Sequence, residues 1–296
     1  MGYSIFTTVL ASAATKDLSD LITVKEELKI TSSTDDGWLG KAISQTSAAI
    51  AGYCKRLFVP QLVQDLFDLD QDPYPYQTPG GFPALVLSCS PVIALLSVVQ
   101  SPAPGQANIL TEGADFRVDQ ETGRLLRLNK WTGGVTAWEA YPVTVQYAGG
   151  CGTETVEAHS VPSGSPYTTQ VSGTFGCDIS VTDAAGAMLA RVKVAPAAGQ
   201  YSVASDGTYT FAAADAGKAL TIAYASPSVP ADVTACVVQM VNARWSARGR
   251  DPTLVQRDMP NQGMERWWVG GQPGQDGPFP PDIAATLDAW RQPVIA

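Results

Sequence analysis

The chain has 296 residues, and its 28 acidic side chains outnumber 19 Lys and Arg, giving a formal net charge of −9. This balance argues against a protein that grips nucleic acid through its phosphates, because such binding needs clustered Lys and Arg. With 45% hydrophobic and 16% charged residues, the chain can bury a sizeable core and is not disordered. Its 27 glycines and 21 prolines favour turn-rich β structure, and its single histidine, His159, excludes multi-histidine metal sites.

The first segment predicts two helices. Thr23 and Glu26 form a capping box that opens a short helix through Leu28. A second start signal at Asp35 and Asp36 precedes apolar residues at helical spacing, which predict a helix over Asp35–Tyr53.

From residue 61 the apolar period changes to that of strands. Gly123 supplies the turn of a predicted hairpin within 116–128. The predicted strands are Leu62–Leu69, Ala84–Ser88, Ile93–Val99, Phe116–Asp119, Arg124–Leu128 and Val143–Tyr147.

Residues 152–225 differ in composition from what precedes them, with small residues and short strands separated by turns. Asp206-Gly207 suits a type I′ hairpin turn. Strands at this spacing predict a small β-sandwich, Ig-like in architecture. The predicted strands are Val156–Val161, Tyr167–Val171, Cys177–Thr182, Ala187–Val194, Gln200–Ala204, Thr208–Ala212 and Ala219–Tyr224.

The last segment is helical again. An apolar stripe predicts a helix over Asp232–Trp245, and a Gly-, Pro- and Arg-rich stretch leads to a short amphipathic helix over Asp282–Trp290. An arginine group and flanking apolar residues are candidates for a protein-binding interface, because Arg forks and Trp are enriched at interfaces. These candidates are Arg244, Arg248, Arg250, Arg257, Arg266, Trp267, Trp268, Ile283, Leu287 and Trp290.

No motif for catalysis or cofactor binding stands out. The sequence has no Walker A loop, no GxGxxG, no HExxH and no GxSxG, so we expect no catalytic, cofactor-binding or metal residues. The acids of 65–72 alternate as on a strand and predict a solvated strand edge. Five cysteines lie too far apart for CxxC pairs and are expected to be buried free thiols: Cys54, Cys89, Cys151, Cys177 and Cys236. Prolines interrupt the uncharged stretch after Asp72, so we expect no membrane span.

Several segments, in order, resemble the head–tail connector (adaptor, or head-completion) proteins of tailed bacteriophages. The resemblance covers about 17–150 and 226–295, and the block between is an insertion similar to Ig-like modules of phage structural proteins. Its motifs are Leu21-Ile-Thr-Val-Lys-Glu-Glu-Leu-Lys-Ile-Thr31, Asp35-Asp-Gly-Trp-Leu39, Ile50-Ala-Gly-Tyr-Cys54, Ser90-Pro-Val-Ile93, Val118-Asp-Gln-Glu-Thr-Gly-Arg-Leu125, Val143-Thr-Val-Gln-Tyr-Ala-Gly149, Val229-Pro-Ala-Asp-Val233 and Ala243-Arg-Trp245.

The resemblance implies an α+β fold: a helical connector core with a small antiparallel β-sheet, plus an inserted all-β, Ig-like sandwich domain. The expected domains are 1–151 (connector core), 152–225 (inserted sandwich) and 226–296 (a core helix and a portal-docking tail).

It also implies a non-enzymatic virion protein of the neck, assembled in the host cytoplasm. The protein would form a homo-oligomeric ring, expected to be dodecameric, between the portal protein and a stopper or tail-terminator protein. Genomic double-stranded DNA would pass through the ring unbound, and an acidic lumen would repel its phosphates.

Three alternatives stay open. The protein could be a tail or capsid-surface structural protein whose Ig-like module binds glycans or a host surface. A secreted hydrolase is a more distant alternative, lacking a nucleophile motif. The last helix could also fold back on its own subunit rather than dock on the portal.

Overall fold

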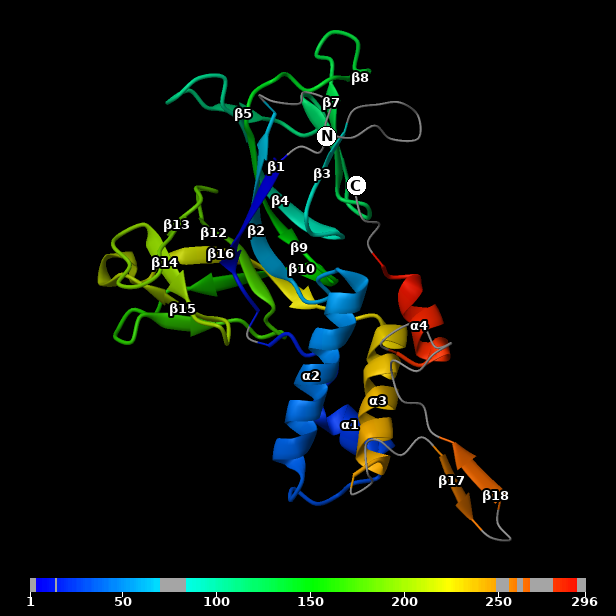
Figure 1. Ribbon diagram of the computed structural model, residues 1–296. Helices are drawn as coiled ribbons and strands as arrows, with labels where there is room; N and C mark the ends of the chain where they lie inside the picture. The colour runs from blue at the N-terminus through cyan, green and yellow to red at the C-terminus, as the bar shows by residue number, and fades with distance from the viewer. Residues whose placement is uncertain are drawn as a thin grey trace. The chain divides into compact units, whose positions relative to one another are not determined.

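The computed structural model describes residues 4–13, 15–69, 84–248, 256–259, 263–266 and 279–291 (Figure 1). The chain divides into two compact units. The β unit comprises Met1–Thr15 and Leu57–Ser228, and the helical unit comprises Lys16–Arg56 and Val229–Ile295.

Two long helices dominate the helical unit. They bury apolar stripes against each other, with Leu39 and Ile43 on α2 and Val237 and Val241 on α3. The pairing of these two helices agrees with the stripes in the sequence. The elements are α1 (Leu21–Glu27), α2 (Asp36–Cys54), α3 (Ala231–Ser246), α4 (Pro281–Asp288) and a hairpin of β17 (Gln256–Met259) and β18 (Gly263–Arg266).

The start of α1 differs from the predicted capping box. Asp20 is the N-cap, and its carboxylate accepts a hydrogen bond of 2.6 Å from the Thr23 amide. The helix therefore begins two residues before Thr23, because Asp20 takes the N-cap role that Thr23 was expected to have and satisfies the amide of Thr23, the third helical residue.

Two antiparallel sheets form the base of the β unit and enclose an apolar core, which includes Phe67, Phe116, Trp138 and Tyr147. Gly123, at φ 69°, makes the predicted turn between β6 and β7. The first sheet has the order β1 (Ser4–Ala11), β2 (Gln61–Asp68), β9 (Val143–Gly149), β4 (Val92–Gln100), β5 (Asn108–Leu110). The second has β3 (Ala84–Val86), β7 (Arg124–Leu128) and β6 (Phe116–Asp119), with β8 (Val135–Thr136) on β7.

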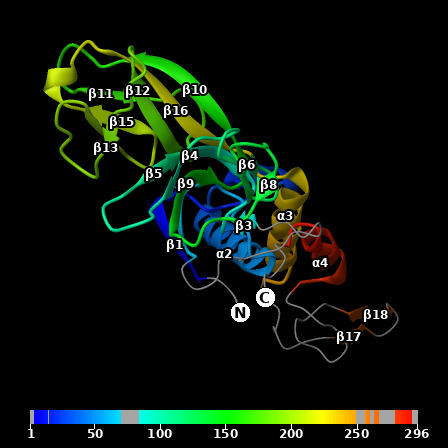
Figure 2. The same ribbon diagram turned by 90° about the horizontal axis from the view of Figure 1, so that it is seen from above.

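Residues 152–227 form a two-layer sandwich, which both views show as a group of strands (Figures 1 and 2). Its core holds Tyr201, Tyr209, Phe211 and Ile222. One layer is β10 (Gly152–Ser160), β16 (Ala219–Pro227) and β12 (Cys177–Asp183). The other is β11 (Thr168–Gln170), β15 (Thr208–Phe211), β14 (Gln200–Val203) and β13 (Ala190–Arg191).

The turn at Asp206-Gly207 is not of the predicted type. Only Gly207 has a positive φ there, of 80°, whereas a type I′ turn needs positive φ at both central residues. The type I′ prediction for Asp206-Gly207 is therefore wrong.

The sandwich joins the base sheet through small side chains rather than through a loose linker. Ala148 of β9 shares a buried cluster with Ile179 of β12 and Ala225 of β16. At the crossing, a Cβ on Gly150 would come within 2.7 Å of the Val59 carbonyl oxygen, and a Cβ on Gly152 within 2.5 Å of that of Ser226. Glycine is therefore needed where β9 passes into β10.

The predicted fold class is wrong. The described residues hold eighteen strands and four α-helices, and an extensive apolar core lies between β-sheets. The chain is therefore mainly antiparallel β and has no helical connector core with a small sheet. The underestimate has a physical source: β1, β5 and β8 owe their strand pairing to partners that local periodicity does not reveal.

The prediction that the acids of 65–72 lie on a solvated strand edge is wrong for Asp65. Asp65 is fully buried, because β2 lies between β1 and β9. All five cysteines are buried, as predicted, and none of them forms a disulfide bond. Among the helices of the described residues, none combines the length and the apolar character needed to cross a membrane.

Candidate functional site

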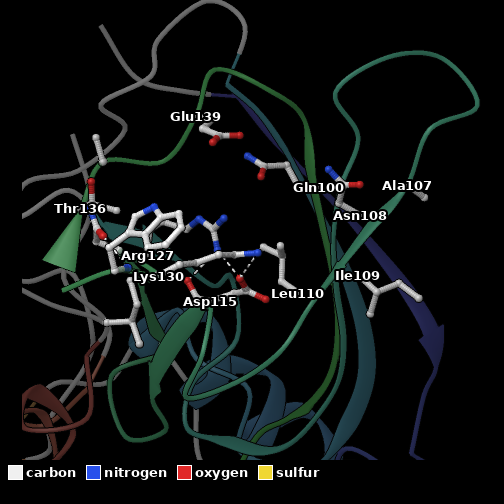
Figure 3. A pocket seen from close by; sticks show the side chains of 14 residues that line it. Gln100, Ala107, Asn108, Ile109, Leu110, Asp115, Arg127, Lys130, Thr136 and Glu139 are labelled. Atoms are coloured by element: carbon white, nitrogen blue, oxygen red, sulfur yellow. Dashed lines mark hydrogen bonds and ion pairs between the residues drawn. The ribbon is translucent and has the colours of Figure 1, made fainter. Parts of the chain in front are cut away.

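A pocket of about 880 Å³ opens in the β unit between the β4–β5 hairpin and the strands β7 and β8 (Figure 3). Glu139, Gln100 and Asn108 line one side of the view, and Asp115, Lys130 and Leu110 line the other. The remaining lining residues are Ala107, Ile109, Arg127, Leu128, Asn129, Trp131, Thr136 and Ala137.

Asp115 organises one wall of this pocket. Its carboxylate accepts a hydrogen bond of 2.9 Å from the Thr111 amide and lies 3.1 Å from Lys130 Nζ and 3.6 Å from Arg127 Nη1. The Thr111 amide, with smaller contributions from Lys130 and Arg127, outweighs burial and lowers the pKa of Asp115. Arg127 is itself buried and donates to the Asp115 carbonyl oxygen at 2.7 Å. The wall is therefore a fixed ion-pair cluster.

The opposite wall offers an unused polar group. Gln100 is 2% exposed, and its amide nitrogen has no hydrogen-bond partner among the described residues. A buried donor without a partner carries a desolvation cost, which a bound polar group would relieve.

Two large apolar side chains at the pocket are exposed. Trp131 is 94% exposed and Ile109 is 77% exposed. The Asn129 side chain accepts from the Trp131 and Thr132 amides, at 2.9 and 3.2 Å, so the backbone of this hairpin tip is held in place. An exposed Trp on a fixed turn is typical of a binding surface.

The polar and aromatic lining of this pocket suits binding of a ligand. The lining residues include no Ser, His or Cys, and of the two carboxylates Asp115 is paired with Arg127 and Lys130. His159 lies elsewhere, on β10, where its ring nitrogens contact Glu157 at 2.8 Å and Thr169 at 3.2 Å. In the part of the chain that the structure describes, no group of three or more His, Cys, Asp or Glu side chains is placed to hold a metal ion.

The predicted interface residues belong to the helical unit, and two arginines among them contact their own subunit. Arg244 donates to the side chain of Gln45 at 2.6 Å. Arg248 pairs with Asp35 at 2.8 Å, and its guanidinium carbon lies 4.9 and 4.5 Å from the ring centres of Trp38 and Trp245. Arg250 and the Trp267-Trp268 pair lie outside the described residues. Arg257 and Arg266 fall on β17 and β18.

The apolar candidates of the last helix pack within the helical unit. Ile283 and Leu287 are 5% and 0% exposed, and α4 lies against α2 and α3, beside α3 in both views (Figures 1 and 2). Trp290 donates from Nε1 to Asp232 at 2.7 Å. These contacts agree with the alternative in which the helix folds back on its own subunit, and docking of this segment on a partner stays a prediction.

Sequence reasoning missed the pocket altogether. Its walls come from segments that meet only through strand pairing, and none of them carries a motif. The one available signal was Trp131 in the turn Asn129-Lys-Trp-Thr-Gly-Gly134, since a Trp in a Gly-containing turn has little chance of burial.

No protein-family profile and no curated protein matches this sequence. Among solved structures, the chain is similar to a chain described as "Neck of empty GTA particle computed with C6 symmetry". It is also similar to one described as "Virion of native gene transfer agent (GTA) particle". In both cases the identity is 10%, the TM-score is 0.44, and the alignment covers 98% of this chain and 97% of the other.

Proposed function

We propose that this chain is a structural protein of the neck of a tailed-phage-like particle. In this role it is a head–tail connector that forms a ring under the portal, joins the capsid to the tail and lets double-stranded DNA pass. The ring is expected to be dodecameric, from the family that the sequence resembles.

One observation carries the proposal. The segments that bear the first and last connector-like motifs, before residue 57 and after residue 228, fold together as one helical unit although the β unit separates them in sequence. The helices of these motifs, α2 and α3, pack against each other, with Trp38 edge-on to Trp245 at 5.6 Å between ring centres. The first and last motifs of the resemblance therefore lie in one packed unit, as a single connector-like chain that resumes after 152–225 requires.

The charge of the chain suits DNA passage. A net charge of −9 gives a surface that repels phosphates, so a duplex can slide through a ring without being held. A stopper or tail-terminator protein would close the other side of the ring.

The portal contact is placed in the segment from Arg244 to Ala296. Within it, Ile283 and Leu287 are buried in the helical unit and anchor the segment rather than contact a partner. The candidates for the contact itself are therefore the Trp267-Trp268 pair with Arg250, Arg257 and Arg266.

Electron microscopy tests the role, and portal binding tests the contact. The purified chain is imaged alone and with the portal protein of the same genome, and binding is measured for a Trp267→Ala/Trp268→Ala variant. We expect ring-shaped complexes coaxial with the portal, and a loss of affinity on the order of tenfold or more in the double variant.

Trp131→Ala is the matched control, since it removes an exposed Trp from the β unit. It should bind portal as the unchanged chain does, and all variants should keep their melting temperature. Absence of any ring or portal complex contradicts the connector role. Loss of binding in Trp131→Ala alone moves the contact to the pocket.

A second candidate function is that of a tail or capsid-surface protein that binds glycans. The pocket favours it, because the exposed Trp131 offers a stacking face to a neutral sugar, and the same pocket is lined by Gln100, whose amide nitrogen has no hydrogen-bond partner among the described residues. Saturable binding on a glycan array that is lost in Trp131→Ala would support this function. The site would then lie outside the sandwich of 152–225, to which the sequence assigned glycan binding.

A further inference from the structure

The first strand of the base sheet is an edge strand with unusual composition. β1 pairs with β2 along 4–11 and, within the described residues, has no strand on its other side. An edge strand presents unpaired amides and carbonyls that can template pairing with another chain, and proteins usually block such edges with charged side chains or Pro.

The other edge strands of the β unit that are longer than three residues carry charged side chains. β6 carries Arg117 and Asp119, β10 carries Glu154 and Glu157, and β12 carries acids at both ends. Of the described edge strands longer than three residues, β1 alone has no charged residue, and it has no Pro. Its side chains are also open to solvent, with Phe6 60% and Val9 48% exposed.

The opposite edge of the same sheet, although short, also lacks charged side chains. β5 is Asn-Ile-Leu, without charge, and Ile109 is 77% exposed. In a chain of net charge −9, these two neutral edges are places where two copies can meet without bringing acids together.

We infer that β1 of one copy pairs with β5 of the next, so that the five-stranded sheets of neighbouring copies join edge to edge. The inference rests on the proposed ring, because a closed ring uses two different surfaces of each copy, head to tail. A pair of two β1 strands would instead make a two-fold dimer.

The topology fixes the direction of the junction. Each neighbouring pair in the order β1-β2-β9-β4-β5 is antiparallel, so β1 and β5 run in the same direction. The junction between copies is therefore parallel, since successive copies in a ring keep the same sense.

Cross-linking distinguishes the two arrangements. Thr8→Cys and Ile109→Cys place thiols at exposed positions of β1 and β5, and a short bis-maleimide links thiols without demanding one register. The native cysteines leave a low background, because all five are buried and burial raises the thiol pKa to about 11 for Cys54 and about 12 for Cys177.

We expect the double variant to give a ladder of covalent oligomers, and each single variant to stay monomeric under denaturing conditions. A dimer that stops at two copies in Thr8→Cys alone overturns the inference in favour of a two-fold β1 pair. Rings seen by electron microscopy without cross-links also overturn it, while leaving the connector role intact.

A charge variant supplies an independent arm. Thr8→Glu puts an acid on the neutral edge and should shift the mass distribution from rings to monomers. Val156→Glu is the matched control, because Val156 is 58% exposed on β10, which already carries acids. Assembly of Thr8→Glu equal to that of the control contradicts the inference. Portal binding by monomeric Thr8→Glu would show that the proposed function survives without this junction.

Discussion

The hydroxyl of Tyr147 donates a hydrogen bond of 2.8 Å to the carboxylate of Asp65, and both residues are fully buried. The same carboxylate accepts from the Thr7 hydroxyl at 2.7 Å and from the Ser88 amide and hydroxyl at 2.8 and 2.7 Å. One acid on β2 thereby ties together β1, β9 and the chain after β3.

Replacing this acid should destabilise the β unit strongly. Asp65→Ala removes the acceptor of the buried Tyr147 hydroxyl and of the half-buried Ser88 donors, at about 1–3 kcal/mol for a buried group left unsatisfied. We expect a loss of about 3–5 kcal/mol in the free energy of unfolding, measured by urea denaturation. Asp65→Asn keeps the side-chain volume and one acceptor oxygen and should lose less; an equal loss in both variants would show that the remaining amide oxygen contributes nothing and that the carboxylate itself is required.

Glu157 makes the sandwich sensitive to acid. Burial raises its pKa, but hydrogen bonds from Tyr224, from the Ser172 amide and hydroxyl, and from His159 outweigh burial and lower the pKa to about 2. Because the folded-state pKa lies below the unfolded value, this stabilisation is present above about pH 4.5 and is lost as the pH falls toward 2.

Glu157→Gln should therefore be less stable than the unchanged chain by about 2 kcal/mol at pH 7, and the difference should shrink between pH 5 and about pH 2. Thermal unfolding of both proteins across this pH range measures it. Glu154→Gln, on the same strand and exposed, is the control. A difference that does not vary with pH would exclude the ionised carboxylate as its source.

The sandwich and the base sheet should unfold together. Ile179 is 6% exposed and belongs to the small cluster that joins β12 and β16 to β9. Ile179→Ala should cost about 2–4 kcal/mol and lower the melting temperature of the whole β unit. Calorimetry checks whether the β unit unfolds in one transition or in two. An independent transition for residues 152–225 would show that the sandwich is an autonomous appendage.

Arg248 should act within its own subunit. Its ion pair with Asp35 and its two Trp contacts are partly exposed, so together they are worth about 1–2 kcal/mol. Arg248→Lys should lose most of this, because an ammonium cannot reproduce the planar guanidinium on two rings. A double-mutant cycle with Asp35→Ala measures the pair, and Arg291→Ala is an exposed control. No change in stability would return Arg248 to the partner-binding candidates.

The elements that the sequence determined by itself are those with a local signal. The apolar stripes of α2 and α3 and the Gly123 turn between β6 and β7 depend on residues a few positions apart, and each formed near its predicted bounds. The short strands of 152–225 likewise follow from turn spacing.

Only the tertiary structure decided what covers each face. Ser4–Ala11 is a strand because β2 pairs with it from 58 residues away, and Asp65 is buried because Thr7, Ser88 and Tyr147 converge on it. The pocket beside Trp131 likewise lies between the β4–β5 hairpin and the strands β7 and β8, which come together only in the folded sheets. The spacing of apolar residues shows that one side of a helix or strand is apolar, but it does not show which other element covers that side. The balance between sheets and helices, the buried acid and the pocket all depend on that covering element.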